Sequence, residues 1–123
     1  ILEKIRLHSW NVHGGLSPWF RGGATLFWPT YMLQPEYTGM TFHETINSVD
    51  AGNIVYQNSA KIRAEDGVHE NACRVIKEFC DKLPNLLEKK LSKKTKIKSL
   101  PQWTSGKIWT KKKLDSFKLK SYL

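Results

Sequence analysis

A short apolar run near the start of the chain, followed at once by glycines, constrains the fold more than any other feature. Residues 5–12 alternate and then become apolar, and Gly14 and Gly15 follow directly. This pattern is typical of a buried strand that ends in a turn. The predicted order of strand, loop, helix, strand, strand and helix over about 90 residues indicates a layered α/β fold, in which a strand buried on both faces needs neighbouring strands. Because few neighbouring strands are available in 123 residues, part of the sheet is expected to be missing.

The remainder of residues 1–90 is expected to alternate between strands and helices. A short aromatic helix is predicted over 24–33, kinked at Pro29 and ended by Gln34-Pro35-Glu36. Residues 37–46 and 54–57 have the β-branched and aromatic content of strands.

The clearest predicted helix starts near residues 65–67. Apolar residues then recur at three- and four-residue spacing, at Val68, Ala72, Val75, Ile76, Phe79 and Leu83. Pro84 is expected to break or restart this helix, and the apolar stripe continues at Leu86, Leu87 and Leu91.

Charge is distributed unevenly along the chain. Residues 1–88 carry a net charge of −2, whereas residues 89–123 carry +11, with twelve lysines and no arginine. We therefore divide the chain into a domain part, 1–90, and a basic tail, 91–123, with short candidate elements at 107–110 and 114–119. A solvated lysine-rich face is favoured for the tail because base recognition prefers Arg. The alternative is a nucleic-acid contact through charge and through stacking on Trp103 and Trp109.

Cysteine usage, hydropathy and histidine spacing exclude several classes of protein. Cys73 and Cys80 lie about 10 Å apart on a helix, too far for a disulfide, and two reduced thiols favour a cytoplasmic location. The longest uncharged stretch, 22–35, contains Gly, Pro, Thr and Gln, so no membrane span is expected. The four histidines show no metal-ligand spacing, so no metal is expected. The chain begins at Ile1 with sequence typical of a folded region, which predicts a fragment of a longer protein.

A polar pair at the end of the first predicted strand is the clearest candidate for chemistry. Asn11 and His13 are two residues apart, so their side chains leave the same side of the strand. An amide donor beside an imidazole can stabilise an oxyanion, and a carboxylate from a neighbouring loop could orient the imidazole. Such a pair alone more often satisfies the backbone of a turn. A serine hydrolase is disfavoured because Pro18 follows Ser17 where a nucleophile elbow needs an adaptable residue.

Three segments, taken in order, resemble the 10-formyltetrahydrofolate-dependent formyltransferases. Residues 11–22 resemble the family's N-x-H…L-x-P-x-x-R-G segment, residues 38–43 are similar to its T-G-x-T-x-H strand, and residues 49–55 continue the likeness. Asp50 follows Asn11 by 39 residues, close to the family's separation. The resemblance covers about residues 1–90 and implies the C-terminal half of a Rossmann-like formyltransferase domain, with the N-terminal half absent.

This resemblance implies roles for individual residues. Asn11, His13 and Asp50 match the family's catalytic residues, in which Asn11 and a protonated His13 bind the oxyanion. Asp50 would keep His13 cationic and help to move a proton from the attacking amine to the leaving folate nitrogen. The resemblance also implies that 10-formyltetrahydrofolate binds through its pterin ring to the loop formed by Thr45, Ile46, Asn47, Ser48 and Val49.

Other polar and aromatic residues near these motifs receive weaker assignments. Arg21 either supports the loop or an anionic group, or is an exposed loop arginine. For Thr41 and His43 a place on a strand beside the site is expected, and for His43 a structural role is favoured. Five aromatic residues are expected in the core: Trp19, Phe20, Phe27, Trp28 and Tyr31.

The resemblance favours a small-molecule substrate. We expect the parent protein to formylate the amino group of a nucleotide-linked amino sugar. One alternative is an enzyme of the methionyl-tRNA type, whose lysine-rich tail would contact RNA phosphates. The other is a non-catalytic nucleic-acid-binding module. The tail of about 33 residues is too short for the barrel-like second domain of the tRNA enzymes.

Overall fold

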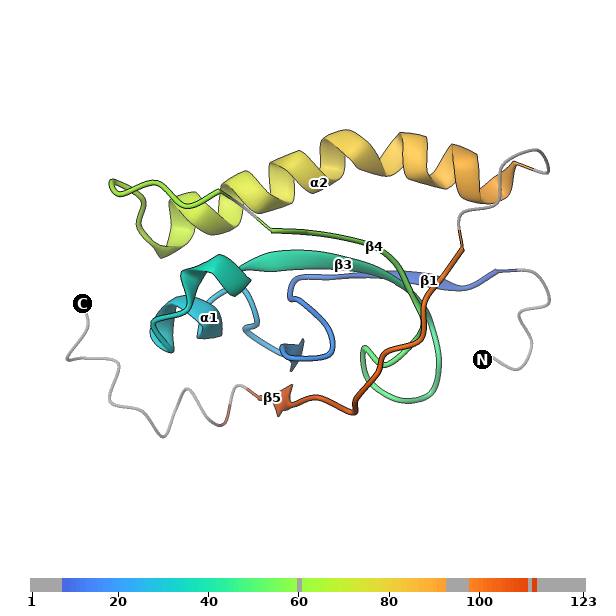
Figure 1. The fold of residues 1–123 in the computed structure, drawn as a ribbon, viewed down its shortest axis with the longest axis horizontal. Coiled ribbons are helices and arrows are strands. Elements are labelled where there is room, and N and C mark those ends of the chain that lie inside the picture. The colour runs from blue at the N-terminus through green and yellow to red at the C-terminus, as the bar shows by residue number, and fades with distance from the viewer. Residues whose placement is uncertain (1–7, 60, 93–97, 111, 113–123) are drawn as a thin grey trace.

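A computed structural model describes residues 8–59, 61–92, 98–110 and 112. Within these residues, three strands and one long helix form two layers: β1 (Trp10–His13), β3 (Gly39–Glu44), β4 (Ile54–Ser59) and α2 (Val68–Leu91). The strands form an antiparallel sheet of order β1-β3-β4, which carries α2 on one face and the shorter elements on the other (Figure 1). The mixed architecture confirms the predicted α/β class.

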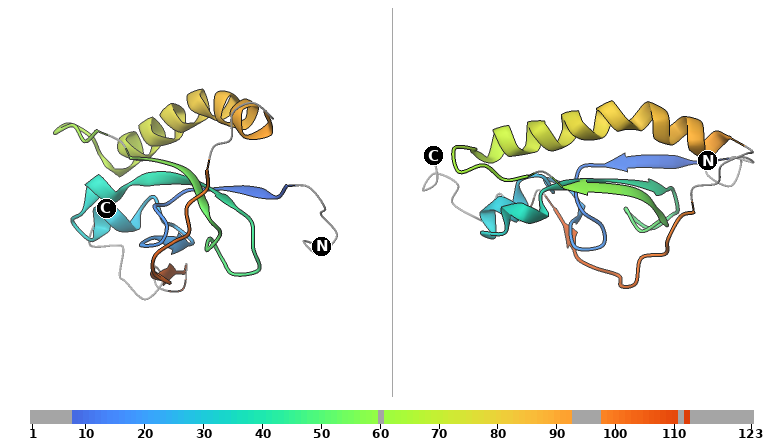
Figure 2. Two further views of the ribbon diagram at one scale, coloured as in Figure 1. Left: turned by 45° about the vertical axis from the view of Figure 1, so that its right-hand side comes forward. Right: turned by 45° about the horizontal axis from the view of Figure 1, so that its top comes forward.

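The smaller elements lie on the sheet face away from α2. They are β2 (Arg21–Gly22), α1 (Trp28–Tyr31), the 3-10 helix η2 (Pro35–Tyr37) and β5 (Ile108–Trp109). Two further views show the last of these at the end of the orange segment that follows α2 in the chain (Figure 2). β2 and β5 pair in parallel, so residues far apart in the sequence meet there.

The main hydrophobic core lies between the sheet and α2. Met40 and Phe42 of β3 pack with Val75 and Phe79 of α2, and all four are at most 7% exposed. Burying a side chain of this size stabilises the fold by about 1.5–3 kcal/mol. The predicted apolar stripe therefore forms the core-facing side of the helix.

Helix α2 differs from the prediction at Pro84. The expected break is wrong, because α2 continues through Pro84 to Leu91. Proline removes one backbone hydrogen bond in a helix interior. Leu83, Leu86 and Leu87 pack against the core on both sides of it, and this packing outweighs the local loss.

Short elements on the opposite face also depart from the predictions. The helix predicted over 24–33 comprises only Trp28–Tyr31, because Pro29 occupies its first turn and starts the helix instead of kinking it. The strand predicted over 37–46 begins at Gly39, after η2. The third strand extends two residues beyond the prediction, to Ser59.

β1 is an edge strand within the described residues. Asn11 and Val12 are exposed, so the prediction of a strand buried on both faces is wrong for this part of the chain. The pairing of β1 with β3 alone leaves its other edge open among the described residues. Residues 5–7 of the predicted strand lie outside the described residues.

A second hydrophobic cluster joins the segment after β1 to the basic tail. Phe20 and Trp28 pack with Trp109, and each is less than 8% exposed. Trp109 stacks on Phe20 with ring centroids 5.5 Å apart, so this buried ring does not fit the alternative in which it stacks on a nucleic-acid base. Trp103 remains 66% exposed. The tail candidate at 107–110 contains β5, and the one at 114–119 lies outside the described residues.

Other predictions concern single side chains. Phe20 and Trp28 are buried as predicted, whereas Trp19 is 41% exposed and its core assignment is wrong. Cys73 and Cys80 are free thiols on α2. No described helix is long and apolar enough to cross a membrane. In the described part of the chain, no three His, Cys, Asp or Glu side chains are grouped as metal ligands.

Candidate functional site

The site begins at the end of β1, where Asn11 and His13 project toward one point. The register of β1 against β3 places Asn11 opposite His43 and His13 opposite Thr41. His13 is buried, whereas Asn11 is exposed at the edge of the sheet.

Asp50 reaches this point from the loop between β3 and β4. Its Oδ2 lies 3.3 Å from Nδ1 of His13, and its Oδ1 lies 3.4 Å from Nε2 of His43. The amide of Asn11 donates to Oδ1 at 3.5 Å, and the backbone N–H of Gly22 donates to Oδ2 at 2.8 Å. The carboxylate therefore bridges two imidazoles, and the three residues singled out from the sequence lie together.

His43 belongs to this cluster, although the sequence favoured a structural role for it. Its Nδ1 donates to the carbonyl oxygen of Glu44 at 2.8 Å, which leaves Nε2 facing Asp50 and the amide of Asn11 at 3.2 Å. When neutral, Nε2 can accept from Asn11; when protonated, it can donate to Asp50. The signal available in the sequence was the T-G-x-T-x-H segment, but the strand register that brings His43 to Asn11 could not be read from it.

The pKa values of His43 and Asp50 are both shifted, because burial acts on each group in one direction while hydrogen bonds and neighbouring charges act in the other. Burial lowers the pKa of His43, but the hydrogen bond and the charge of Asp50 and the Glu44 carbonyl outweigh it, so the pKa is raised overall. Burial likewise raises the pKa of Asp50. Hydrogen bonds from His43 and Gly22, together with the charges of His13 and His43, outweigh that effect and lower the pKa overall. The two shifts together favour a carboxylate beside an imidazolium.

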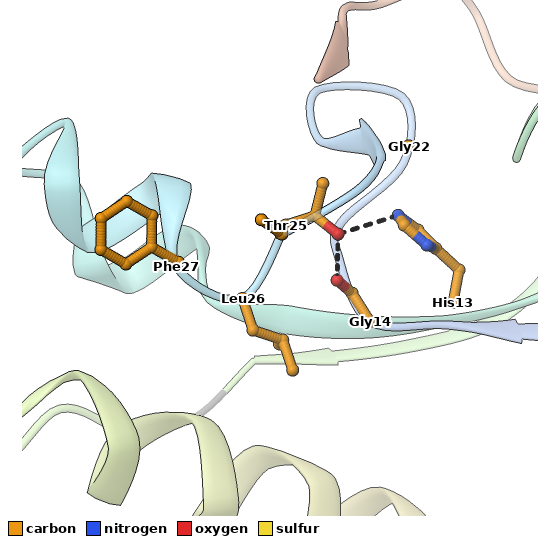
Figure 3. A pocket seen from close by; sticks show the side chains of 7 residues that line it. His13, Gly14, Gly22, Thr25, Leu26 and Phe27 are labelled. Carbon is orange, nitrogen blue, oxygen red and sulfur yellow. Dashed lines mark hydrogen bonds between the residues drawn. The ribbon is translucent and has the colours of Figure 1, made fainter. Parts of the chain in front are cut away.

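Both ring nitrogens of His13 have partners, since Nδ1 faces Asp50 and Nε2 faces the segment that follows β1. Its Nε2 donates to the carbonyl oxygen of Phe20 at 2.7 Å, and the hydroxyl of Thr25 lies 3.5 Å from the same nitrogen. Figure 3 shows Thr25 between the ring of His13 and the carbonyl of Gly14, to which its hydroxyl donates. A shallow pocket of about 390 Å³ opens beside this ring, and it is lined by His13, Gly14, Gly22, Ala24, Thr25, Leu26 and Phe27.

Arg21 is a buried residue that supports the Asp50 loop. It is 4% exposed, so the alternative of an exposed loop arginine is wrong. Its guanidinium donates to the carbonyl oxygen of Val49 at 2.7 Å, to the hydroxyl of Ser48 at 3.1 Å and to the carbonyl oxygen of Ser105. The alternative in which Arg21 supports this loop is therefore the one that the structure bears out, whereas no sequence feature indicated the contact with Ser105.

The residues predicted to bind folate form the exposed side of the same loop. Ile46 and Val49 are 49% and 53% exposed, and Asn47 and Ser48 are exposed as well. The N–H of Thr45 donates to the carbonyl oxygen of Ser9 at 2.9 Å. None of these residues lines the pocket beside His13, nor a second pocket of about 440 Å³ that lies among Trp19, Phe20, Gln34, Tyr37, Thr104, Gly106 and Lys107.

Comparisons with known proteins extend these observations. The chain matches the model of the protein family described as formyl transferase, over residues 1–87. A curated methionyl-tRNA formyltransferase of Prochlorococcus marinus (strain MIT 9215) is 30% identical over 110 residues, covering 87% of this chain and 33% of that protein.

Two solved structures resemble the fold. The formyltransferase PseJ from Anoxybacillus kamchatkensis, in complex with UDP-4,6-dideoxy-4-formamido-L-AltNAc and tetrahydrofolate, matches with a TM-score of 0.66 at 22% identity, over 88% of this chain and 55% of its own. A sugar N-formyltransferase from a Shewanella species matches with a TM-score of 0.68 at 20% identity, over 89% of this chain and 43% of its own. The chain thus spans about a third of the curated relative. At these identities the two structures show a shared fold.

Proposed function

Because the chain belongs to the formyl transferase family, we propose that it transfers the formyl group of 10-formyltetrahydrofolate to a primary amine of a nucleotide-linked amino sugar. Membership confirms the resemblance found in three sequence segments, and the likeness to solved formyltransferases confirms the predicted Rossmann-like fold class. The substrate, the form of the folate and the role of each residue are parts of the proposal.

The observation that carries the proposal is the carboxylate of Asp50 held between two imidazoles, next to the amide of Asn11. Formyl transfer forms a bond from the amine nitrogen to the formyl carbon and breaks the bond from that carbon to the folate nitrogen. The tetrahedral intermediate carries an oxyanion, and one proton must leave the amine and reach the folate nitrogen. An amide donor, imidazoles and a carboxylate are the groups that such a reaction needs.

We assign the oxyanion to Asn11 and His13. The amide of Asn11 is exposed and can turn from Asp50 toward a substrate oxygen. His13 would exchange the carbonyl oxygen of Phe20 for that oxygen, while Asp50 keeps the ring oriented through Nδ1. Each such donor is worth about 2.7–4 kcal/mol in the transition state.

Proton transfer is assigned to Asp50. Its lowered pKa keeps it ionised near neutral pH, so it can accept hydrogen bonds and receive the proton that the amine nitrogen loses once it has attacked the formyl carbon. His43 holds the second carboxylate oxygen, which restricts Asp50 to one orientation.

The loop of residues 45–49 is suited to a pterin ring. When bound there, 10-formyltetrahydrofolate would supply the formyl carbon. Ile46 and Val49 offer apolar surface, and among the described residues no hydrogen bond occupies the backbone groups of Ile46 or Asn47. Apolar contact with a few convergent polar groups is what a flat heteroaromatic ring requires.

A methionyl-tRNA type activity is the second candidate, because the curated relative at 30% identity is such an enzyme. The basic tail would then contact RNA phosphates. The non-catalytic nucleic-acid module is less well supported, since Trp109 is buried against Phe20 and Trp28.

The test is formyl transfer by the full chain, measured with 10-formyltetrahydrofolate and either a UDP-linked amino sugar or methionyl-tRNA. We expect product with the amino sugar and none with an N-acetylated control sugar. Formylation of methionyl-tRNA alone would replace the proposed substrate with the second candidate. Transfer to neither amine, with no quenching of tryptophan fluorescence by a reduced folate, would refute the proposed function.

A further inference from the structure

A segment of the basic tail, residues 99–105, runs along the loop that carries Asp50. Figure 1 shows it in orange, running downward to β5 past the connection between β3 and β4. The hydroxyl of Ser99 donates to Glu44 at 2.8 Å, and Leu100 exchanges two backbone hydrogen bonds with Ile54, at 2.7 and 2.8 Å. This segment, which we call the strap, is therefore bonded to both ends of the loop.

The side chain of Gln102 bonds the middle of the loop. Its Nε2 donates to the carbonyl oxygen of Asp50 at 2.7 Å and to that of Gly52 at 2.9 Å. Both partners are acceptors, so only the amino side of the amide can face them. The Oε1 atom is buried without a hydrogen-bond partner among the described residues, and the two donors are thus what holds Gln102 in place.

The loop needs such support because Asp50 has a φ of +47°. This left-handed conformation is one that residues with a side chain adopt only rarely. Arg21 holds the residue before Asp50 and also donates to the carbonyl oxygen of Ser105 on the strap. The backbone at Asp50 is thus bonded on its N-terminal side by Arg21 and on its C-terminal side by Gln102.

We propose that Gln102 is a positioning residue, which fixes the backbone of Asp50 so that the carboxylate stays between His13 and His43. The consequence for catalysis rests on the proposed function; the consequence for the two imidazoles does not. The basic tail thereby has a defined role, because one of its side chains completes the support of the site.

Gln102→Met tests this role, since methionine has a similar length and no donor. In the full chain we expect the pKa of His43, followed by NMR of the imidazole, to shift downward, because burial and the charge of Arg21 then act without the bond to Asp50. The substitution does not alter the other polar and charged groups near the ring of His43, which are His13, Arg21 and Glu44. We expect kcat for formyl transfer to fall by about 10- to 100-fold with little change in KM for the amine, as misplacement of a reacting group predicts.

Gln34→Met is the matched control, because Gln34 is exposed and its side chain makes no hydrogen bond among the described residues. It should leave the titration of His43 and kcat unchanged. If Gln102→Met does not fold, Gln102→Glu replaces it, since a carboxylate has the same shape and cannot donate; kcat should fall similarly.

A folded Gln102→Met protein with an unchanged His43 titration overturns the proposal, whatever its activity. If the wild-type chain shows no formyl transfer, the proposed function fails, and the NMR titration alone still decides the role of Gln102.

Discussion

The two faces of the sheet are held together by different forces. On the α2 side, Phe42, Val75 and Phe79 are buried by at least 99% and contribute through apolar contact, which has no preferred direction. On the other side, Arg21 donates to the carbonyl oxygen of Val49, and Gly22 and Gln102 donate to Asp50, through hydrogen bonds that depend on the placement of individual atoms. The first region supplies stability and the second holds a geometry, so substitutions in the two should separate stability from activity.

Phe79→Ala should give the largest effect on stability. Removing a fully buried ring leaves a cavity and costs about 3–5 kcal/mol, a large part of the stability of a small domain. Ile76→Ala on the same helix is the control, because Ile76 is 37% exposed and should cost much less. Urea unfolding measures both, and equal losses would show that the α2 face is not the main core. Turnover per folded molecule should be unchanged.

Asn11→Ala should lower turnover and leave stability almost unchanged, the converse of Phe79→Ala. Asn11 is exposed, so its removal should hardly change the free energy of unfolding. Loss of an oxyanion donor should lower kcat by about 100-fold or more. Steady-state kinetics beside a urea titration checks both expectations, and undiminished kcat would remove Asn11 from the proposed mechanism.

Gly52→Ala should disturb the loop between β3 and β4, and should therefore lower both stability and turnover. A Cβ at this position would lie 1.6 Å from the carbonyl oxygen of Glu44, which forces the backbone to move. We expect a loss of about 1–3 kcal/mol in unfolding free energy, as for overpacking, together with reduced turnover. A Cβ at Gly23 would meet nothing within 4 Å, so Gly23→Ala is the matched control. A tolerated Gly52→Ala would mean that the loop is less tightly packed than the structure shows.

The pH dependence of stability should be the smallest effect. The lowered pKa of Asp50 contributes stability that is present above the ordinary value of 3.8 and is lost as the pH falls through the folded-state pKa. The raised pKa of His43 contributes stability that is present below 6.5 and is lost as the pH rises through its folded-state pKa. This pair should therefore stabilise the chain most between pH 3.8 and 6.5. Asp50→Asn should flatten both flanks in urea titrations at several pH values; identical profiles would contradict the pairing.

Local patterns in the sequence predicted the elements of the apolar face well. The stripe from Val68 to Leu83 identified α2, because helical periodicity is a local property. Pro84 was misinterpreted because packing of its leucine neighbours, which is not local, outweighs its intrinsic preference. The edge position of β1 was missed for the same reason, since alternation does not show which strands pair.

The polar region was predicted only where a motif marked it. Asn11, His13 and Asp50 were singled out, and the structure places them together. The contact between His43 and Asn11 could not be predicted, because it follows from the register of β1 against β3. No sequence feature marks Gln102 or Ser105, because their partners lie 50 to 84 residues away and no periodicity or composition connects such positions.

The most direct test of the account compares wild type with Asp50→Asn in formyl transfer and in urea unfolding at pH 7.5. Asparagine keeps the shape of the side chain but cannot take up a proton or bridge two imidazoles as an anion. We expect a fall in kcat of about 100-fold or more, with a much smaller relative change in unfolding free energy. Equal turnover by the two proteins would contradict the central claim that this carboxylate serves the chemistry.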